Sequence, residues 1–127
     1  MPLLIITFLI ILDQLSKYLV RHWGGFYICN SGIAFGLIFP PIIFWLFWIS
    51  IITFIVFQIF NFQFSMSKPA LYLILAGAVS NIIDRLYFNC IIDFININFW
   101  PTIFNLADVF IVMGAMILLI KILRIKN

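Results

Sequence analysis

Residues 42–62 read IIFWLFWISIITFIVFQIFNF and contain no charged side chain. A helix that crosses a bilayer needs about 20 predominantly apolar residues, so this run predicts a membrane-spanning helix. Three further apolar runs occur, and each run follows one or two prolines, which cost least at the start of a helix. The predicted spans are residues 3–20, 42–62, 70–87 and 103–123.

The composition agrees with a lipid environment. Hydrophobic residues make up 66% of the chain and charged residues 9%, against about 45–50% and about 25% in soluble domains. With 127 residues, four spans leave little else, so we expect one all-α membrane-embedded domain over residues 1–127. The net charge of +3 comes from scattered residues, so a nucleic acid partner is not expected.

The titratable inventory excludes several kinds of chemistry. The chain has four Asp, no Glu, one His and two Cys. It therefore lacks an H-E-x-x-H metalloprotease motif, and it cannot build a conventional zinc site. We predict that neither a metal nor a cofactor takes part.

The basic residues predict the orientation. An even number of spans puts both termini on one side, together with the connection after the second span. The positive-inside rule makes this side cytoplasmic, so the tryptophan-rich opposite ends face outward. The basic residues on the cytoplasmic side are Lys68, Lys121, Arg124 and Lys126, against Arg21 and Arg85 near the outer ends.

Two outer segments do not resemble spans. Residues 22–39 hold four of the six glycines, which is typical of a small irregular or β-like lobe. Residues 89–100 alternate Asn or Asp with Ile and Phe. They predict a short interfacial segment that folds over the helices.

Three carboxylates fall inside the predicted spans, and two of them lie near the outer ends of neighbouring helices. Asp84 precedes the end of the third span by about four residues, and Asp108 follows the start of the fourth by about five. In antiparallel neighbours, both lie about 6–8 Å below the outer helix ends at 1.5 Å rise per residue. A carboxylate at bilayer depth costs about 2.5–3.5 kcal/mol, so both are candidate functional residues.

The two sites repeat one spacing. Asn81 and Asn105 each stand three residues before an Asp, a spacing that puts amide and carboxylate on one helix face. Small residues around Gly77 and Gly114 allow the two helices to approach closely. Carboxylates that meet in a low dielectric share a proton, as an aspartic-protease dyad requires. The alternatives are a salt bridge or helix contact, and a transporter or proton channel.

The other polar residues predict supporting roles. Asp13 and Lys17 are four residues apart on one helix, which favours a structural ion pair, although Lys17 near the outer end could also line a substrate path. Asp93 is expected in the outer loop, solvated or pinning that loop rather than catalytic. Cys29 and Cys90 fall on the same outer side, so a disulfide is permitted but not required.

The polar motifs together resemble lipoprotein signal peptidase, the bacterial signal peptidase II. They stand in the family's order and cover nearly the whole chain. Ala76 and Ser80 occupy positions where Gly is more usual. The motifs are Asp13-Gln14-x-x-Lys17, Asn30-x-Gly32-x-Ala34-Phe35, Gly77-Ala78-x-x-Asn81-x-x-Asp84-Arg85, Asp93-Phe94 and Phe104-Asn105-x-Ala107-Asp108.

The resemblance implies a four-helix aspartic endopeptidase of the bacterial inner membrane. It implies that the enzyme removes the signal peptide from diacylglyceryl-modified prolipoproteins, cutting before the lipidated cysteine. We expect membrane lipids as its surroundings, a monomer, and an active site towards the outer face. The catalytic pair maps onto Asp84 and Asp108, and the residues expected to bind substrate or support the site are Asn30, Asn81, Arg85, Asn105, Asp13 and Lys17.

Overall fold

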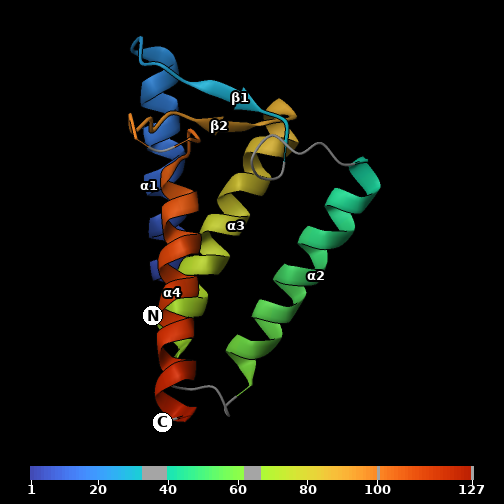
Figure 1. The fold of residues 1–127 in the computed structure, drawn as a ribbon. Helices are drawn as coiled ribbons and strands as arrows, with labels where there is room; N and C mark the ends of the chain where they lie inside the picture. The colour runs from blue at the N-terminus through green and yellow to red at the C-terminus, as the bar shows by residue number, and fades with distance from the viewer. Residues whose placement is uncertain (33–39, 62–66, 100, 127) are drawn as a thin grey trace.

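Four long helices form the body of the protein (Figure 1). The computed structural model describes residues 1–32, 40–61, 67–99 and 101–126. All four helices are long and apolar enough to cross a membrane, which confirms the predicted fold class. The elements are α1 (Pro2–His22), β1 (Ile28–Asn30), α2 (Pro41–Phe60), α3 (Lys68–Phe88), β2 (Ile91–Asp93) and α4 (Leu106–Lys126).

The start of α4 differs from the prediction. The helix begins at Leu106 rather than at residue 103. The cause is Phe104, which forms an isolated antiparallel bridge with Ile95 and also accepts a hydrogen bond from the backbone N–H of Phe94. Its backbone is therefore extended, and Asp108 falls in the first helical turn instead of about five residues inward.

A two-stranded antiparallel sheet covers the end of the bundle opposite the termini (Figure 1). Ile28 pairs with Asp93 and Asn30 with Ile91. The β-like lobe is confirmed for β1, whereas the second outer segment supplies the partner strand instead of lying as a purely interfacial piece. Residues 33–39 of the predicted lobe lie outside the described residues.

The third helix is central, because α1, α2 and α4 all pack against it. The approach to α4 is so close that a Cβ atom on Gly77 would lie 2.3 Å from the carbonyl oxygen of Ala107. A Cβ on Gly114 would lie 2.6 Å from the carbonyl oxygen of Ala70. The prediction that small residues let these helices approach is therefore confirmed. By contrast, α2 leans away from the other three helices (Figure 1).

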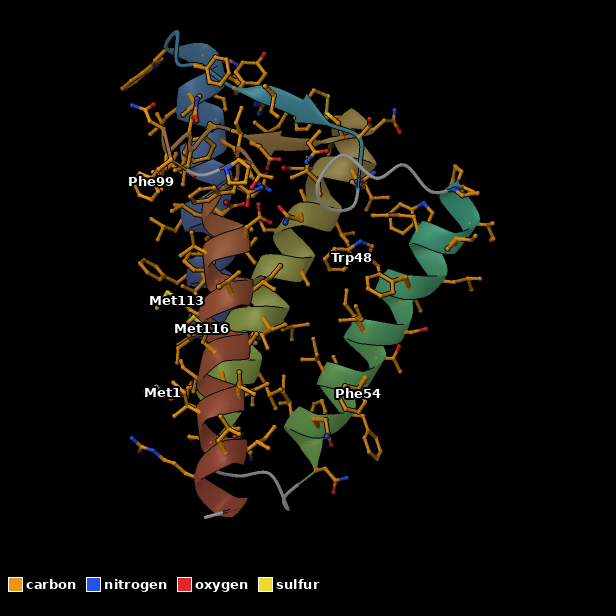
Figure 2. All side chains as sticks on the ribbon, in the orientation of Figure 1. Met1, Trp48, Phe54, Phe99, Met113 and Met116 are labelled. Carbon is orange, nitrogen blue, oxygen red and sulfur yellow. A yellow bond between two sulfur atoms is a disulfide. The ribbon has the colours of Figure 1, made fainter. Side chains whose placement is uncertain are left out.

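The distribution of side chains separates a lipid-facing surface from a polar end. Large apolar side chains such as Phe54, Met113 and Met116 are exposed along the helices (Figure 2), as expected where lipid is the solvent. Oxygen and nitrogen atoms gather beneath the sheet (Figure 2). The buried polar groups are Asp13, Lys17, Ser67, Ser80, Asn81, Asp84, Asp93 and Asn105, and all but Ser67 belong to the two networks described below.

Candidate active site

A buried lysine lies at the centre of the first polar network. The ammonium group of Lys17 is 2.6 Å from Asp13 Oδ2 and 2.8 Å from Asp84 Oδ2, and it donates to Asn81 Oδ1 at 3.1 Å. Both carboxylates are 0% exposed. The predicted Asp13–Lys17 ion pair is confirmed, and its extension to Asp84 is an addition. Buried charges persist when they are paired and hydrogen-bonded, as all three are here.

Two further side chains complete this network. Gln14 donates to Asp84 Oδ1 at 2.9 Å and to the Ser80 hydroxyl oxygen at 3.0 Å. The Ser80 hydroxyl in turn donates to Asp13 Oδ2 at 2.7 Å. The sequence motifs contain Gln14 and Ser80 but predicted no role for either side chain. Both are polar side chains inside apolar runs, and this feature could have identified them as members of the network.

The second network surrounds Asn105, directly before α4. Its side-chain amide donates to Asp93 Oδ1 at 2.7 Å and to Asn81 Oδ1 at 3.1 Å. Its backbone N–H donates to Asp108 Oδ2 at 3.2 Å, while its Oδ1 accepts from the N–H of Asp108 at 2.9 Å. This reciprocal arrangement is that of a capping box at a helix N-terminus. Asn105 therefore contacts both Asp93 and Asp108.

Only one of the two asparagines serves the carboxylate that its spacing predicted: Asn105 contacts Asp108, but Asn81 does not contact Asp84. Asn81 donates to Asp108 at 2.9 Å, on the neighbouring helix, whereas the side-chain amide donor to Asp84 is Gln14. The prediction that each Asp has its own Asn one turn earlier is therefore wrong for Asp84. The packing of α1 against α3 brings Gln14 and Lys17, rather than Asn81, within reach of Asp84.

Asp93 is buried, at 2% exposure, so the expectation of a solvated carboxylate is wrong, whereas the alternative that it pins the outer segment agrees with its contacts. Asn30 on β1 donates to its Oδ2 at 2.9 Å, and Asn105 holds its other oxygen. Burial raises the pKa of Asp93 to about 6, and the negative charge of Asp108 contributes in the same direction. The hydrogen bonds from Asn30 and Asn105 and the charge of Lys17 oppose this rise.

Arg85 lies beside the carboxylates but connects other parts of the molecule. Its guanidinium donates to the carbonyl oxygen of Ser31 at 3.0 Å and to that of Gly32. It also lies over the ring of Phe44 on α2, 4.0 Å from the ring centroid. The alternative of a simple Asp84–Arg85 salt bridge is not what forms, since the partner of Asp84 is Lys17. Arg85 joins α3 to α2 and to the chain after β1.

Cys29 and Cys90 form a disulfide, with their Cα atoms 5.4 Å apart. The bond joins β1 to the residue just before β2. Cys29 immediately precedes Asn30, the donor to Asp93, so the disulfide restrains the strand that carries this donor. The sequence permitted this bond without requiring it.

The predicted site residues thus converge on one end of a polytopic membrane protein. Six of them, together with Asp93, make contacts in the two networks: Asp13, Lys17, Asn81, Asp84, Asn105 and Asp108. Asn30 reaches Asp93 from the sheet. Across the described ranges, no group of three or more His, Cys, Asp or Glu side chains is arranged to hold a metal ion. A carboxylate cluster thus lies below the small sheet, at one end of the helices.

Comparison with known proteins identifies the class. The sequence profile of the family described as signal peptidase (SPase) II matches residues 5–124. The chain therefore belongs to the signal peptidase II family, and it is a peptidase of the membrane.

Individual relatives cover nearly the whole chain. The lipoprotein signal peptidase of Caldanaerobacter subterraneus subsp. tengcongensis is 33% identical over 93% of this chain and 92% of its own length. The lipoprotein signal peptidase of Syntrophomonas wolfei is 39% identical over 90% of this chain and 87% of its own length. A bacterial membrane enzyme solved by the in meso method at 2.3 Å superposes with a TM-score of 0.89 at 26% identity, covering 99% of this chain and 89% of that one.

Proposed function

We propose that the protein is an aspartic endopeptidase that removes the signal peptide from diacylglyceryl-modified prolipoproteins, cutting before the lipidated cysteine. Family membership and the names of its relatives support the substrate class. The observation that carries the aspartic mechanism is the second network, in which Asn105 contacts two carboxylates at once.

The geometry favours Asp93 and Asp108 as the catalytic pair. An aspartic dyad needs two carboxylates that share one proton, with one activating water and the other polarising the scissile carbonyl. Such sharing depends on mutual repulsion between the two carboxylates, which a cation bonded directly to either one would cancel. Asp93 and Asp108 meet this condition, because the charge of Asp108 raises the pKa of Asp93 and amides rather than ammonium groups hold both.

Asp84 fits the catalytic role less well. Its Oδ2 accepts from Lys17 and from the backbone N–H of Ile92 at 3.0 Å, and its Oδ1 accepts from Gln14. Three of its four acceptor positions are therefore filled, which leaves less room for water or substrate than on Asp93 or Asp108. The sequence-based pairing of Asp84 with Asp108 stays a prediction, and substitutions described below separate the two pairs.

The remaining supporting residues orient the proposed dyad. Each carboxylate oxygen of Asp93 and Asp108 accepts one hydrogen bond, from Asn30, Asn81 or Asn105. A carboxylate oxygen has two acceptor positions, so each retains one for water or substrate. Asp108 lies in the first turn of α4, where a negative charge is stabilised by the helix dipole.

The membrane position suits a lipid-modified substrate. A signal peptide can approach as an apolar helix through the lipid, while the acyl chains of the modified cysteine stay in the bilayer. The dyad lies at the sheet-covered end of the spans, so water needs only a short path. This reading is favoured over a transporter or proton channel, because the Lys17 network is closed by its own hydrogen bonds.

Cleavage of defined precursors tests the proposal. The purified protein in lipid nanodiscs is incubated with a precursor carrying a diacylglyceryl-modified cysteine, and with the same precursor unmodified. We expect a shortened product beginning at the modified cysteine only from the first. Equal cleavage of both would refute the substrate class, and no cleavage of either would refute the function.

The orientation is part of the proposal. The disulfide between Cys29 and Cys90 supports an outward-facing sheet, because disulfides persist in oxidising compartments. The basic residues near the opposite end support cytoplasmic termini. Reporter fusions at Asn127 test this, and an external C-terminus would refute an outward-facing site.

A further inference from the structure

The two fully buried carboxylates each hold one particular backbone N–H group. Asp84 Oδ2 accepts from the N–H of Ile92 at 3.0 Å, and Ile92 immediately precedes Asp93. Asp13 Oδ1 accepts from the N–H of Ala107 at 2.9 Å, and Ala107 immediately precedes Asp108. Each member of the proposed dyad therefore follows a residue that is held by a buried carboxylate.

Lys17 connects these two carboxylates. Its ammonium is 2.6 Å from Asp13 and 2.8 Å from Asp84, and Ser80 and Gln14 bridge the same pair through hydrogen bonds. One cation between two anions sets their separation. Because the anions bind the backbone next to Asp93 and Asp108, this separation also sets the spacing of the dyad.

We propose that Asp13, Lys17 and Asp84 form a positioning cluster that fixes the distance between the carboxylates of Asp93 and Asp108. The inference rests on the proposed function. It gives the first-helix motif a mechanical role: α1 supplies the cation and one anion, α3 supplies the other anion, and β2 and α4 carry the catalytic groups. A displacement of about 1 Å in such a site costs on the order of 100-fold in rate.

The central test compares two substitutions at Asp84. Asp84→Leu removes the acceptor for the N–H of Ile92, whereas Asp84→Asn keeps an oxygen that can accept it. Lys17 retains Asp13 as its partner in both variants. We expect Asp84→Leu to lower kcat about 100-fold with KM little changed, and Asp84→Asn to recover at least about tenfold of that loss.

Rescue by Asn separates positioning from catalysis. If Asp84 itself belongs to the dyad, Asp84→Asn is as inactive as Asp84→Leu, and the positioning role is refuted. The same comparison at Asp13, made with Asp13→Leu and Asp13→Asn, is expected to give the same order. Ser50→Ala on α2, whose hydroxyl bonds only within its own helix among the described contacts, is the control and is expected to match the parent.

The pH profile supplies a readout that a purely structural role does not move. A wider spacing weakens the repulsion between Asp93 and Asp108, and the loss of one anion leaves more of the Lys17 charge to act on Asp93. Both effects are expected to shift the upper limb of the kcat/KM profile to lower pH in Asp84→Asn and Asp13→Asn. A smaller fraction of folded enzyme would lower kcat/KM at every pH without shifting the upper limb of the profile. An unchanged limb together with unchanged kcat in both Asn variants refutes the inference.

The inference can still be tested if Asp84→Leu fails to fold. In that case the test rests on kcat and on the upper limb of the kcat/KM profile of Asp84→Asn and Asp13→Asn. They are also distinct from a failure of the proposed function. That failure is seen when the parent does not cleave the lipidated precursor, or when Asp93→Asn retains parental activity.

Discussion

Two pairs of carboxylates lie at the same end of the bundle and differ in what surrounds them. Asp13 and Asp84 share one lysine and are 0% exposed. Asp93 and Asp108 are held by asparagine amides and by the backbone N–H of Asn105. The same amino-acid type thus stands in two environments, because the first pair shares an ammonium group while the second pair is held by amide and backbone N–H donors.

Under the proposed assignment, burial alone does not identify a catalytic carboxylate. All four aspartates lie near the sheet, and the most deeply buried ones are neutralised. A catalytic acid needs an environment that shifts its pKa towards the pH at which the enzyme works. The pKa of Asp93, raised to about 6 by burial and by the charge of Asp108, is the physical sign of such an environment.

The largest expected effect comes from breaking the second pair. Asp93→Asn and Asp108→Asn are nearly isosteric, so each keeps its contacts and loses the ionisable group. We expect each to lower kcat at least about 1,000-fold, and the double variant to be little worse, since residues that act as a unit are non-additive. Single-turnover cleavage of the lipidated precursor measures this.

The comparison with Asp84→Asn decides which pair is catalytic. Folding of every variant is checked by its thermal unfolding midpoint in the same nanodiscs. Parental activity in Asp93→Asn with complete loss in Asp84→Asn would restore the pairing of Asp84 with Asp108.

The next effect is on pH dependence. The pKa of folded Asp93, about 6, lies above its ordinary value of 3.8, so folding favours the protonated form. This contribution to stability is fully present below pH 3.8 and is lost as the pH rises through about 6. We expect the thermal unfolding midpoint of the parent to fall between pH 3.8 and about pH 6. The midpoint of Asp93→Asn is expected to change less over the same range.

Removal of the neighbouring charge sharpens the test. Because Asp108 raises the pKa of Asp93, Asp108→Asn is expected to shift the window to lower pH. The carboxylic-acid C=O stretch in infrared difference spectra follows Asp93 directly. An unshifted titration in Asp108→Asn would mean that the two carboxylates are not coupled.

The helix contact beneath the site offers a matched pair of glycines. Gly77→Ala places a Cβ 2.3 Å from the carbonyl oxygen of Ala107, and Gly114→Ala places one 2.6 Å from that of Ala70. Overpacking of this kind costs about 1–3 kcal/mol, so both variants are expected to have lower unfolding midpoints. Only Gly77→Ala should also reduce kcat per folded enzyme, because Ala107 precedes Asp108.

Equal activity of the two folded glycine variants would show that displacement at Ala107 does not reach the dyad. The measurement is cleavage normalised to the folded fraction, with Gly114→Ala as the control for reduced stability alone.

Hydropathy was sufficient to predict the four spans, because lipid requires long apolar helices. It could not predict the start of α4, since that boundary depends on Phe104 pairing with Ile95. The strand β2 was missed for the same reason. A three-residue strand forms through its partner, and nothing local in residues 91–93 indicates β1.

Most of the residues that meet below the sheet were predicted, but Asp93 was not expected among them and the arrangement was predicted only in part. Spacing correctly identified Asp13 and Lys17 as an ion pair, because that contact lies within one helix. The choice between Asp84 and Asp93 as the partner of Asp108 depends on how α1 is rotated against α3, which delivers Lys17 to Asp84. Contacts between elements of this kind leave no periodic signal in the chain.

The smallest expected effect is that of reagents aimed at other catalytic groups. Cys29 and Cys90 are bonded to each other, so a thiol-alkylating agent has no free cysteine to modify. The proposed chemistry passes through Asp93 and Asp108 and requires no serine nucleophile and no metal. We therefore expect cleavage of the lipidated precursor to continue at the parental rate after treatment with a chelator, a thiol alkylator or a serine-directed inhibitor. Inhibition by the chelator that added Zn²⁺ or Mg²⁺ reverses would instead indicate a metal between the two carboxylates. Asp93→Asn, assayed with and without that metal, would then show whether the second pair holds it.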